Sequence, residues 1–175
     1  MTYRLADVAR CWAGFASLGA GLVHAAVISE HWKAWWAYGV FFAVVAAFQL
    51  VSAMLLLRGE LRRVEQSVLV VNVVVLAVWV LTRTTGLPFG PEAGRVEHTG
   101  AADLGAAALQ LACVACVGML PSLERRRAHR SAVGYLAALG AGALAMSLVA
   151  TPALAGTPAG EHVVPHGHTG SSTSH

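Results

Sequence analysis

Charged residues are scarce in this sequence. Only 12% of its 175 residues are Asp, Glu, Lys or Arg, whereas 57% are hydrophobic and the mean hydropathy is +0.62. So few charges cannot cover the surface of a soluble globule, and the apolar runs are too many and too long for a single core. The composition therefore excludes an ordinary soluble domain and predicts a polytopic membrane protein.

Lysine is nearly absent, since Lys33 is the single lysine beside eleven arginines. The arginines fall in short blocks between apolar runs without interleaved aromatic residues, so the net charge of +3 does not indicate a nucleic-acid partner. The glycine-rich turn at 86–90 lacks the lysine and the strand that a phosphate-binding loop needs, so no nucleotide is expected. No hydrolase or oxidoreductase pattern is present either, and we expect the protein not to be an enzyme.

Cysteine is also scarce, with three residues in the whole chain. Cys113 and Cys116 form a C-x-x-C pattern, but the pattern lies near the middle of an apolar run. A redox pair needs a solvent-accessible thiolate at the start of a helix. We therefore expect these two cysteines to be packing residues.

Five apolar runs are long enough to cross a bilayer, which takes about 20 residues per helix. They predict an all-α membrane bundle with helices at about 11–29, 34–57, 66–82, 104–123 and 131–154. The first two runs are separated only by residues 30–33, so they should form a tight antiparallel hairpin. Residues 1–155 then form the transmembrane domain, with a long outer loop at 83–103, and residues 156–175 form a polar tail.

Basic residues are distributed unequally over the connecting segments. Nine arginines lie before the first run, after the second or after the fourth, whereas only Lys33, Arg83 and Arg95 lie on the other side. Because cytoplasmic segments carry the excess of basic residues, we expect the N-terminus inside and the C-terminus outside a plasma membrane. The small residues around Ala155 also fit a cleavage site, so the tail is either attached to a fifth span or released from it.

Four polar side chains lie within or beside the apolar runs. An isolated amide in hydrocarbon is costly, so Gln49 and Asn72 should each hydrogen-bond to a neighbouring helix. Gln110 follows Asp103 by seven residues, which places both on one helical face. We expect that face to point into the bundle.

Histidines and acidic residues collect on the predicted outer side. His24 lies inside the first run and His31 follows seven residues later, on the same face but about 10 Å along the helix. That spacing is too wide for one metal ion, so further ligands would have to come from Glu97 and His98 in the loop. An ionisable side chain at membrane depth must pair or line a cavity. These four residues are therefore a candidate metal site, and hydrogen bonding to neighbouring helices is the alternative.

The outer loop is rich in proline and glycine, which favours rigid turns and a defined path. It also brings Arg83 near Glu97 and Asp103 in the chain. We expect these three charges to form a structural ion-pair network that folds the loop over the bundle.

The polar tail contains His162, His166 and His168 among Gly, Ser, Thr and Pro residues. This composition cannot build a core and predicts disorder, while a short histidine-rich tract is suited to Cu(II) or Zn(II). A solvated tail with incidental histidines is the alternative. No haem is expected, because only His24 clearly lies at membrane depth.

Two motifs resemble a known group of proteins. The first is H-x6-H followed by W-W-x-x-G-x-F-F, from His24 to Phe42. The second is T-R-T-x-G-L-P-F-G-P-x-x-G-x-x-E-x-x-G-x-x-D, from Thr82 to Asp103. Together they resemble a group of actinobacterial integral membrane proteins of unassigned function, over about the first four predicted helices. The resemblance implies that the outer-side residues act as a unit, and it brings no activity with it.

The residues favour one function and leave a second open. The first is binding or handling of a transition metal, copper or zinc, at the outer face. The second is a non-enzymatic accessory or scaffold subunit whose outer loop docks a membrane protein partner, with purely structural histidines. In both cases the bilayer is the protein's surroundings.

Overall fold

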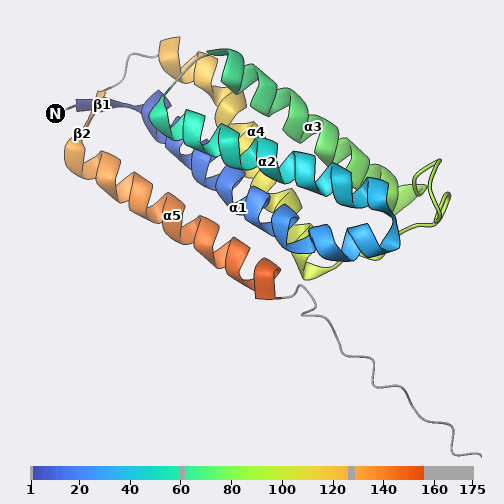
Figure 1. Cartoon of the computed structure of the whole chain (residues 1–175). Coiled ribbons are helices and arrows are strands. Elements are labelled where there is room, and N and C mark those ends of the chain that lie inside the picture. Colours follow the sequence, from blue (N-terminus) through green and yellow to red (C-terminus); the bar gives the residue numbers. More distant parts are fainter. Residues whose placement is uncertain (1, 60–61, 126–128, 156–175) are drawn as a thin grey trace, which may run out of the picture.

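Five helices and two short strands make up the computed structural model, which describes residues 2–59, 62–125 and 129–155 (Figure 1). In chain order they are β1 (Thr2–Arg4), α1 (Leu5–Ala34), α2 (Trp36–Arg58), α3 (Arg62–Thr84), α4 (Ala101–Arg125), β2 (His129–Ser131) and α5 (Ala132–Ala155). The predicted all-α bundle is confirmed. The tail with His162, His166 and His168 lies outside the described residues.

Four helices, α1 to α4, are long and apolar enough to cross a membrane. In α5 the apolar stretch is shorter, Leu136–Pro152, so the fifth span stays a prediction. The chain therefore has the architecture of a multi-pass integral membrane protein.

The α1–α2 hairpin is tighter than the sequence predicted. Helix α1 does not end near residue 29 but continues through the polar residues 30–33, so His31 lies inside the helix rather than beyond it. Only Trp35 separates the two helices, and the glycine at position 39 lets α2 pack directly on Trp32, where any side chain would collide with its ring. The predicted helix end was wrong because neighbouring packing, rather than local polarity, decides where the chain turns.

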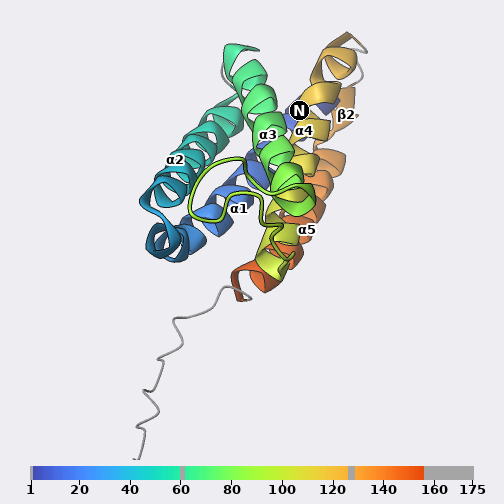
Figure 2. The same ribbon diagram turned by 90° about the vertical axis from the view of Figure 1, so that its right-hand side faces the viewer.

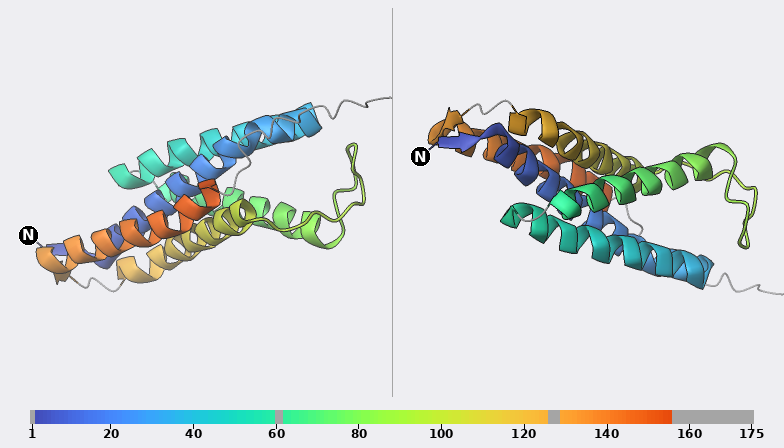
Figure 3. Two further views of the ribbon diagram at one scale, coloured as in Figure 1. Left: turned by 90° about the horizontal axis from the view of Figure 1, so that it is seen from below. Right: turned by 90° about the horizontal axis from the view of Figure 1, so that it is seen from above.

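Helix α1 lies at the centre of the bundle, in contact with α2, α4 and α5, while α3 packs mainly on α4. Helices α2 and α3 follow one another in the chain but make few contacts. They diverge toward the end where residues 85–100 lie (Figure 3). We call this the loop end, and it also contains the α1–α2 turn and the start of α4. The opposite end, with the start of α1 and the end of α4, is the arginine end.

Small residues form much of the core along α1. Ala13, Ala16 and Ala20 are fully buried, and the glycine at position 14 lies against Leu57 of α2. Small side chains let helices approach closely, which favours association inside a membrane. The packing role predicted for Cys113 agrees with its complete burial in the same core.

The predicted polar contact between helices is present in the middle of the bundle. The Gln49 side-chain amide donates to the Asn72 carbonyl oxygen at 3.2 Å, and Asn72 donates in turn to the backbone of Val68. The Ser17 hydroxyl donates to the backbone oxygen of Gln49. These bonds connect α1, α2 and α3 where water is excluded.

A short antiparallel pairing that the sequence did not predict joins the N-terminal residues to the start of α5. Strand β1 pairs with β2 so that Arg4 lies opposite His129. The pairing holds the first residues of α5 beside the first residues of α1 at the arginine end (Figure 1). Helix α5 therefore runs along α1 and α4.

Candidate ligand cavity at the loop end

The segment between α3 and α4 follows a defined path, as its proline and glycine content predicted. Gly86 takes a left-handed conformation, with a φ of 74°, and its N–H donates to the Leu81 carbonyl, so it ends α3. The Gly94 N–H then donates to the Leu87 carbonyl and the Glu97 N–H to the Thr82 carbonyl. The loop thus folds back on itself and places Glu97 beside the end of α3.

The tip of this loop rests on the α1–α2 turn. Gly90, with a φ of 95° that favours glycine, lies against Tyr38 and Trp35, and a Cβ at this position would come within 2.5 Å of the Tyr38 hydroxyl. In Figure 2, which looks toward the loop end, residues 85–100 lie across the space between α2 and α3. The loop therefore covers the bundle at this end.

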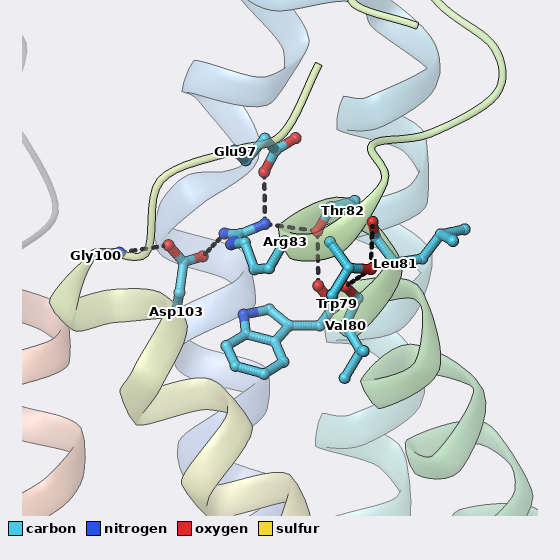
Figure 4. A network of polar contacts seen from close by, with 9 residues as sticks. Trp79, Val80, Leu81, Thr82, Arg83, Glu97, Gly100 and Asp103 are labelled. Atoms are coloured by element: carbon cyan, nitrogen blue, oxygen red, sulfur yellow. Dashed lines mark hydrogen bonds and ion pairs between the residues drawn. The ribbon is translucent and has the colours of Figure 1, made fainter. Parts of the chain in front are cut away.

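Arg83 is the centre of a charged network beneath the loop (Figure 4). Its guanidinium lies 2.6 Å from Glu97 Oε2 and 2.8 Å from Asp103 Oδ1, so both predicted ion pairs are present. Asp103 also accepts the backbone N–H of Gly100 and so caps the start of α4. The network thereby joins α3, the loop and α4 through a side chain that is only 13% exposed.

A cavity of about 270 Å³ lies next to this network, between the first four helices and the loop. Aromatic and aliphatic side chains form most of its wall. Helix α2 contributes Phe41 and Phe42, α3 contributes Val78 and Trp79, and α4 contributes Ala107. The volume is close to the lower limit of small-molecule sites, roughly 300 Å³.

Two histidines line the cavity from α1. His24 Nδ1 lies 2.8 Å from the Ala20 carbonyl and His31 Nδ1 lies 2.9 Å from the Val27 carbonyl. A carbonyl oxygen can only accept, so each Nδ1 is the donor and each neutral ring keeps Nε2 as an acceptor. Both rings also pack against Phe42, with centroids 5.5 Å and 3.9 Å away.

Three hydrogen-bond donors in the cavity wall have no partner among the described residues. They are Nε1 of Trp79, Nε of Arg83 and Nε2 of Gln110. A buried donor without a partner costs about 1–3 kcal/mol, and native folds rarely tolerate such atoms in groups. Gln110 is only 2% exposed and shares the cavity wall with Asp103, which confirms the predicted inward face of α4.

The predicted metal residues do not converge on one point. His24, His31 and Glu97 line the cavity, whereas His98 lies with His31 and Glu97 in a second hollow outside the loop. Within the described ranges, no three His, Cys, Asp or Glu side chains are placed to hold a metal ion together. Glu97 is also bound to Arg83, whose positive charge opposes a cation at the same place.

Trp79, Phe42 and Ala107 were not recognised as site residues from the sequence. Apolar residues in a membrane span give no signal that separates a cavity wall from a lipid-facing surface. The sequence contains one indication of the cavity, which is that Asp103 and Gln110 lie on the same face of α4. This face places the amide of Gln110 below the charged loop.

A second arginine network lies at the arginine end and was not predicted. Arg10 binds Glu65 of α3 at 2.7 Å, Asp7 of its own helix at 3.4 Å, and Glu124 of α4. Asp7 also accepts the backbone N–H of Arg4 and caps α1. From the sequence, Arg10 was interpreted only as one of the basic residues that set the orientation in the membrane.

No family model, curated protein or solved structure shows significant similarity to this chain. The resemblance to actinobacterial membrane proteins therefore stays an expectation. The function has to be argued from the cavity itself.

Proposed function

We propose that this protein binds a small apolar molecule with a hydrogen-bond acceptor in the loop-end cavity. The observation that carries the proposal is the group of buried, unpartnered donors in a wall made mostly of apolar side chains. Ligand sites combine an apolar lining with a few convergent polar groups in this way. An acceptor on the ligand offsets the cost of the unpaired donors, so binding is favoured by both hydrogen bonds and apolar burial.

The loop end faces the outside of the cell in this proposal. Exposed Arg58, Arg62, Arg63 and Arg125 all lie at the arginine end, and basic residues favour the cytoplasmic side. The cavity then opens within the outer half of the bilayer. A plasma-membrane location is part of the same proposal.

A pair of alanines on α4 allows a matched test. Ala107 is buried and lines the cavity, whereas its neighbour Ala108 is exposed on the lipid-facing side. Ala107→Phe should fill the cavity, and Ala108→Phe should add the same ring where there is room. Both variants keep the charge and the helix length.

The measurement is saturable binding of Prodan, a neutral naphthalene ketone whose fluorescence reports apolar surroundings, to detergent-purified protein. The parent protein and Ala108→Phe should bind it with similar affinity, and Ala107→Phe should lose at least tenfold. Equal binding by the two phenylalanine variants would reject the cavity as the site. Saturable binding by none of the three proteins would reject the proposed function.

Transition-metal binding is a second candidate, because Nδ1 of His24 and His31 donates to a backbone carbonyl. Metal-binding histidines are oriented in this way, with the other ring nitrogen left for the metal. A chain ending at Gly160, without the tail histidines, should then bind copper or zinc at neutral pH. The affinity should fall as the pH is lowered, because a protonated imidazole cannot bind a metal ion.

The substitution His24→Ala should abolish that site, and His98→Ala tests whether the loop contributes. If the shortened protein binds no more metal than a detergent blank, the bundle holds no metal site. If neither metal nor Prodan binds, the accessory-subunit hypothesis explains the chain better than either candidate.

A further inference from the structure

The polar groups of the cavity lie at two depths. Asp103 and Gln110 are seven residues apart on α4, and so are His31 and His24 on α1, which is about 10 Å along each helix. The two helices run in opposite directions through the bundle, because α1 ends and α4 begins at the loop end. His31 and Asp103 therefore mark the upper level, nearer the loop, while His24 and Gln110 mark the lower one.

Each level combines one unpaired donor with one imidazole nitrogen that is able to accept. At the upper level the donor is Nε of Arg83, which is held there by its ion pair with Asp103, and the acceptor is Nε2 of His31. At the lower level the donor is Nε2 of Gln110 and the acceptor is Nε2 of His24. A carbonyl oxygen fits the donors, and a hydroxyl group at the same place can also donate to the imidazoles.

The spacing of the levels suits two oxygens on one ring. Seven residues rise about 10.5 Å along a helix, and two hydrogen bonds of about 2.9 Å subtracted from that rise leave about 5 Å between one ligand oxygen at each level. Two oxygens on opposite sides of a six-membered ring have that separation. Phe42 and Trp79 are aromatic residues of the cavity wall, and a flat ring can pack against such side chains.

The charges of the site favour a neutral head group. Arg83 already binds two carboxylates, Glu97 and Asp103, so these three side chains together carry one net negative charge. A fatty acid or a phospholipid phosphate would add a further negative charge close to both carboxylates. Repulsion between like charges is strong at low dielectric, so an anionic lipid is disfavoured.

Two of the helices around the cavity pack only weakly on each other. The loop covers the bundle at Gly90, while α2 and α3 make few contacts with one another and diverge toward the loop end. Phe41 of α2 and Val78 of α3 both line the cavity. At about 270 Å³ the cavity holds a ring but not a long chain as well. A tail attached to the ring would pass between α2 and α3 into the bilayer.

From these observations we propose that the ligand is a quinone or its quinol form, a neutral ring lipid with two opposed oxygens. It enters from the bilayer between α2 and α3. Its ring lies between the two polar levels, and its apolar tail stays in the membrane. This inference rests on the proposed function, because it names the chemical class of ligand for the same cavity.

The test compares three added compounds by the melting temperature of the detergent-purified protein. A prenylated naphthoquinone is the expected ligand, menadione is the same ring without the tail, and palmitate is the anionic lipid control. A ligand that binds only the folded protein raises the melting temperature in proportion to its affinity. The quinones should therefore raise it, with the larger shift for the prenylated compound, and palmitate should not.

The two phenylalanine variants show whether any shift comes from the cavity. Ala108→Phe should keep the quinone shift and Ala107→Phe should lose it. A quinone shift of equal size in both variants, or no shift in the parent protein, would overturn the quinone assignment. If Prodan still binds in the Ala107-dependent manner, only the ligand class is wrong; if Prodan binding also fails, the cavity proposal falls with it.

Discussion

The two ends of the bundle are built alike around one arginine, but different hollows lie beside it. The loop-end cavity has a mostly apolar wall, whereas the hollow at the arginine end is lined by Arg62, Pro121, Glu124 and Arg125. At both ends an aspartate in the first turn of a helix caps that helix and binds the arginine: Asp7 with Arg10 and Asp103 with Arg83. At the loop end, however, three buried donors in the cavity wall lack partners in the described part of the chain. The charged groups at the arginine end are therefore explained by their contribution to the stability of the fold. The unpartnered donors at the loop end do not stabilise the fold, so they need another explanation.

The largest difference that we expect between the two ends is the side of the membrane on which each end lies. If the loop end is outside and α5 is a fifth span, a reporter that works only in the cytoplasm should be silent when fused after His175. The same reporter at the N-terminus should be active. Strong signal from an intact fusion after His175, together with an active N-terminal reporter, would reject α5 as a fifth span. A silent reporter at the N-terminus would reject the orientation.

Loss of Arg10 should destabilise the fold more than loss of any other charge described above. Arg10→Ala leaves three carboxylates without their partner, and Glu65 is only 14% exposed. Exposed ion pairs contribute about 0–1 kcal/mol and broken buried pairs cost about 3–5 kcal/mol, so we expect about 2–3 kcal/mol here. Denaturant or thermal unfolding in detergent measures it, and quinone or Prodan binding should be unchanged at temperatures where the protein stays folded.

Arg83→Ala should cost less stability but should also weaken ligand binding. Its two partners are 43% and 35% exposed, so water can solvate them partly, and we expect about 1–2 kcal/mol. Replacing Arg83 by Leu together with Glu97→Gln and Asp103→Asn should recover most of the stability but not the affinity. An unchanged melting temperature in Arg83→Ala would place these charges in solvent and reject the network.

The substitution Gln110→Met should change stability and ligand affinity in opposite directions. Met has a similar length and needs no hydrogen bond, so removing the unpartnered amide should stabilise the ligand-free protein by about 1 kcal/mol. Quinone affinity should fall by roughly fivefold, because one hydrogen bond contributes about 1 kcal/mol. Loss of stability with unchanged affinity would mean that Gln110 is a structural residue.

Trp79→Phe should produce the smallest change. The ring keeps its packing against the cavity while the unpartnered indole N–H is removed. We expect stability within about 0.5 kcal/mol of the parent protein and an affinity loss of a few-fold. Trp12→Phe is the control, because the Trp12 indole already donates to the Ala138 carbonyl. Removing that bond should lower stability and leave affinity unchanged.

The fold was more predictable than the site because long apolar runs identify membrane helices with little ambiguity. Polarity also predicted the Gln49–Asn72 contact and the Arg83 ion pairs correctly. It failed at the end of α1, where polar residues 30–33 remain helical because α2 packs on them. Which side of each helix faces a cavity depends on how α2 and α3 diverge, and no local pattern encodes that divergence.

Photochemical labelling tests the central claim most directly, because it reports where the ligand lies. An azido-substituted naphthoquinone, activated by light on the detergent-purified protein, should attach to peptides that contain cavity residues such as Phe42, Trp79 and Ala107. An excess of the prenylated naphthoquinone should prevent the labelling, and Ala107→Phe should abolish it. Labelling at the arginine end, or labelling that excess quinone does not reduce, would contradict the assignment of the loop-end cavity as the binding site.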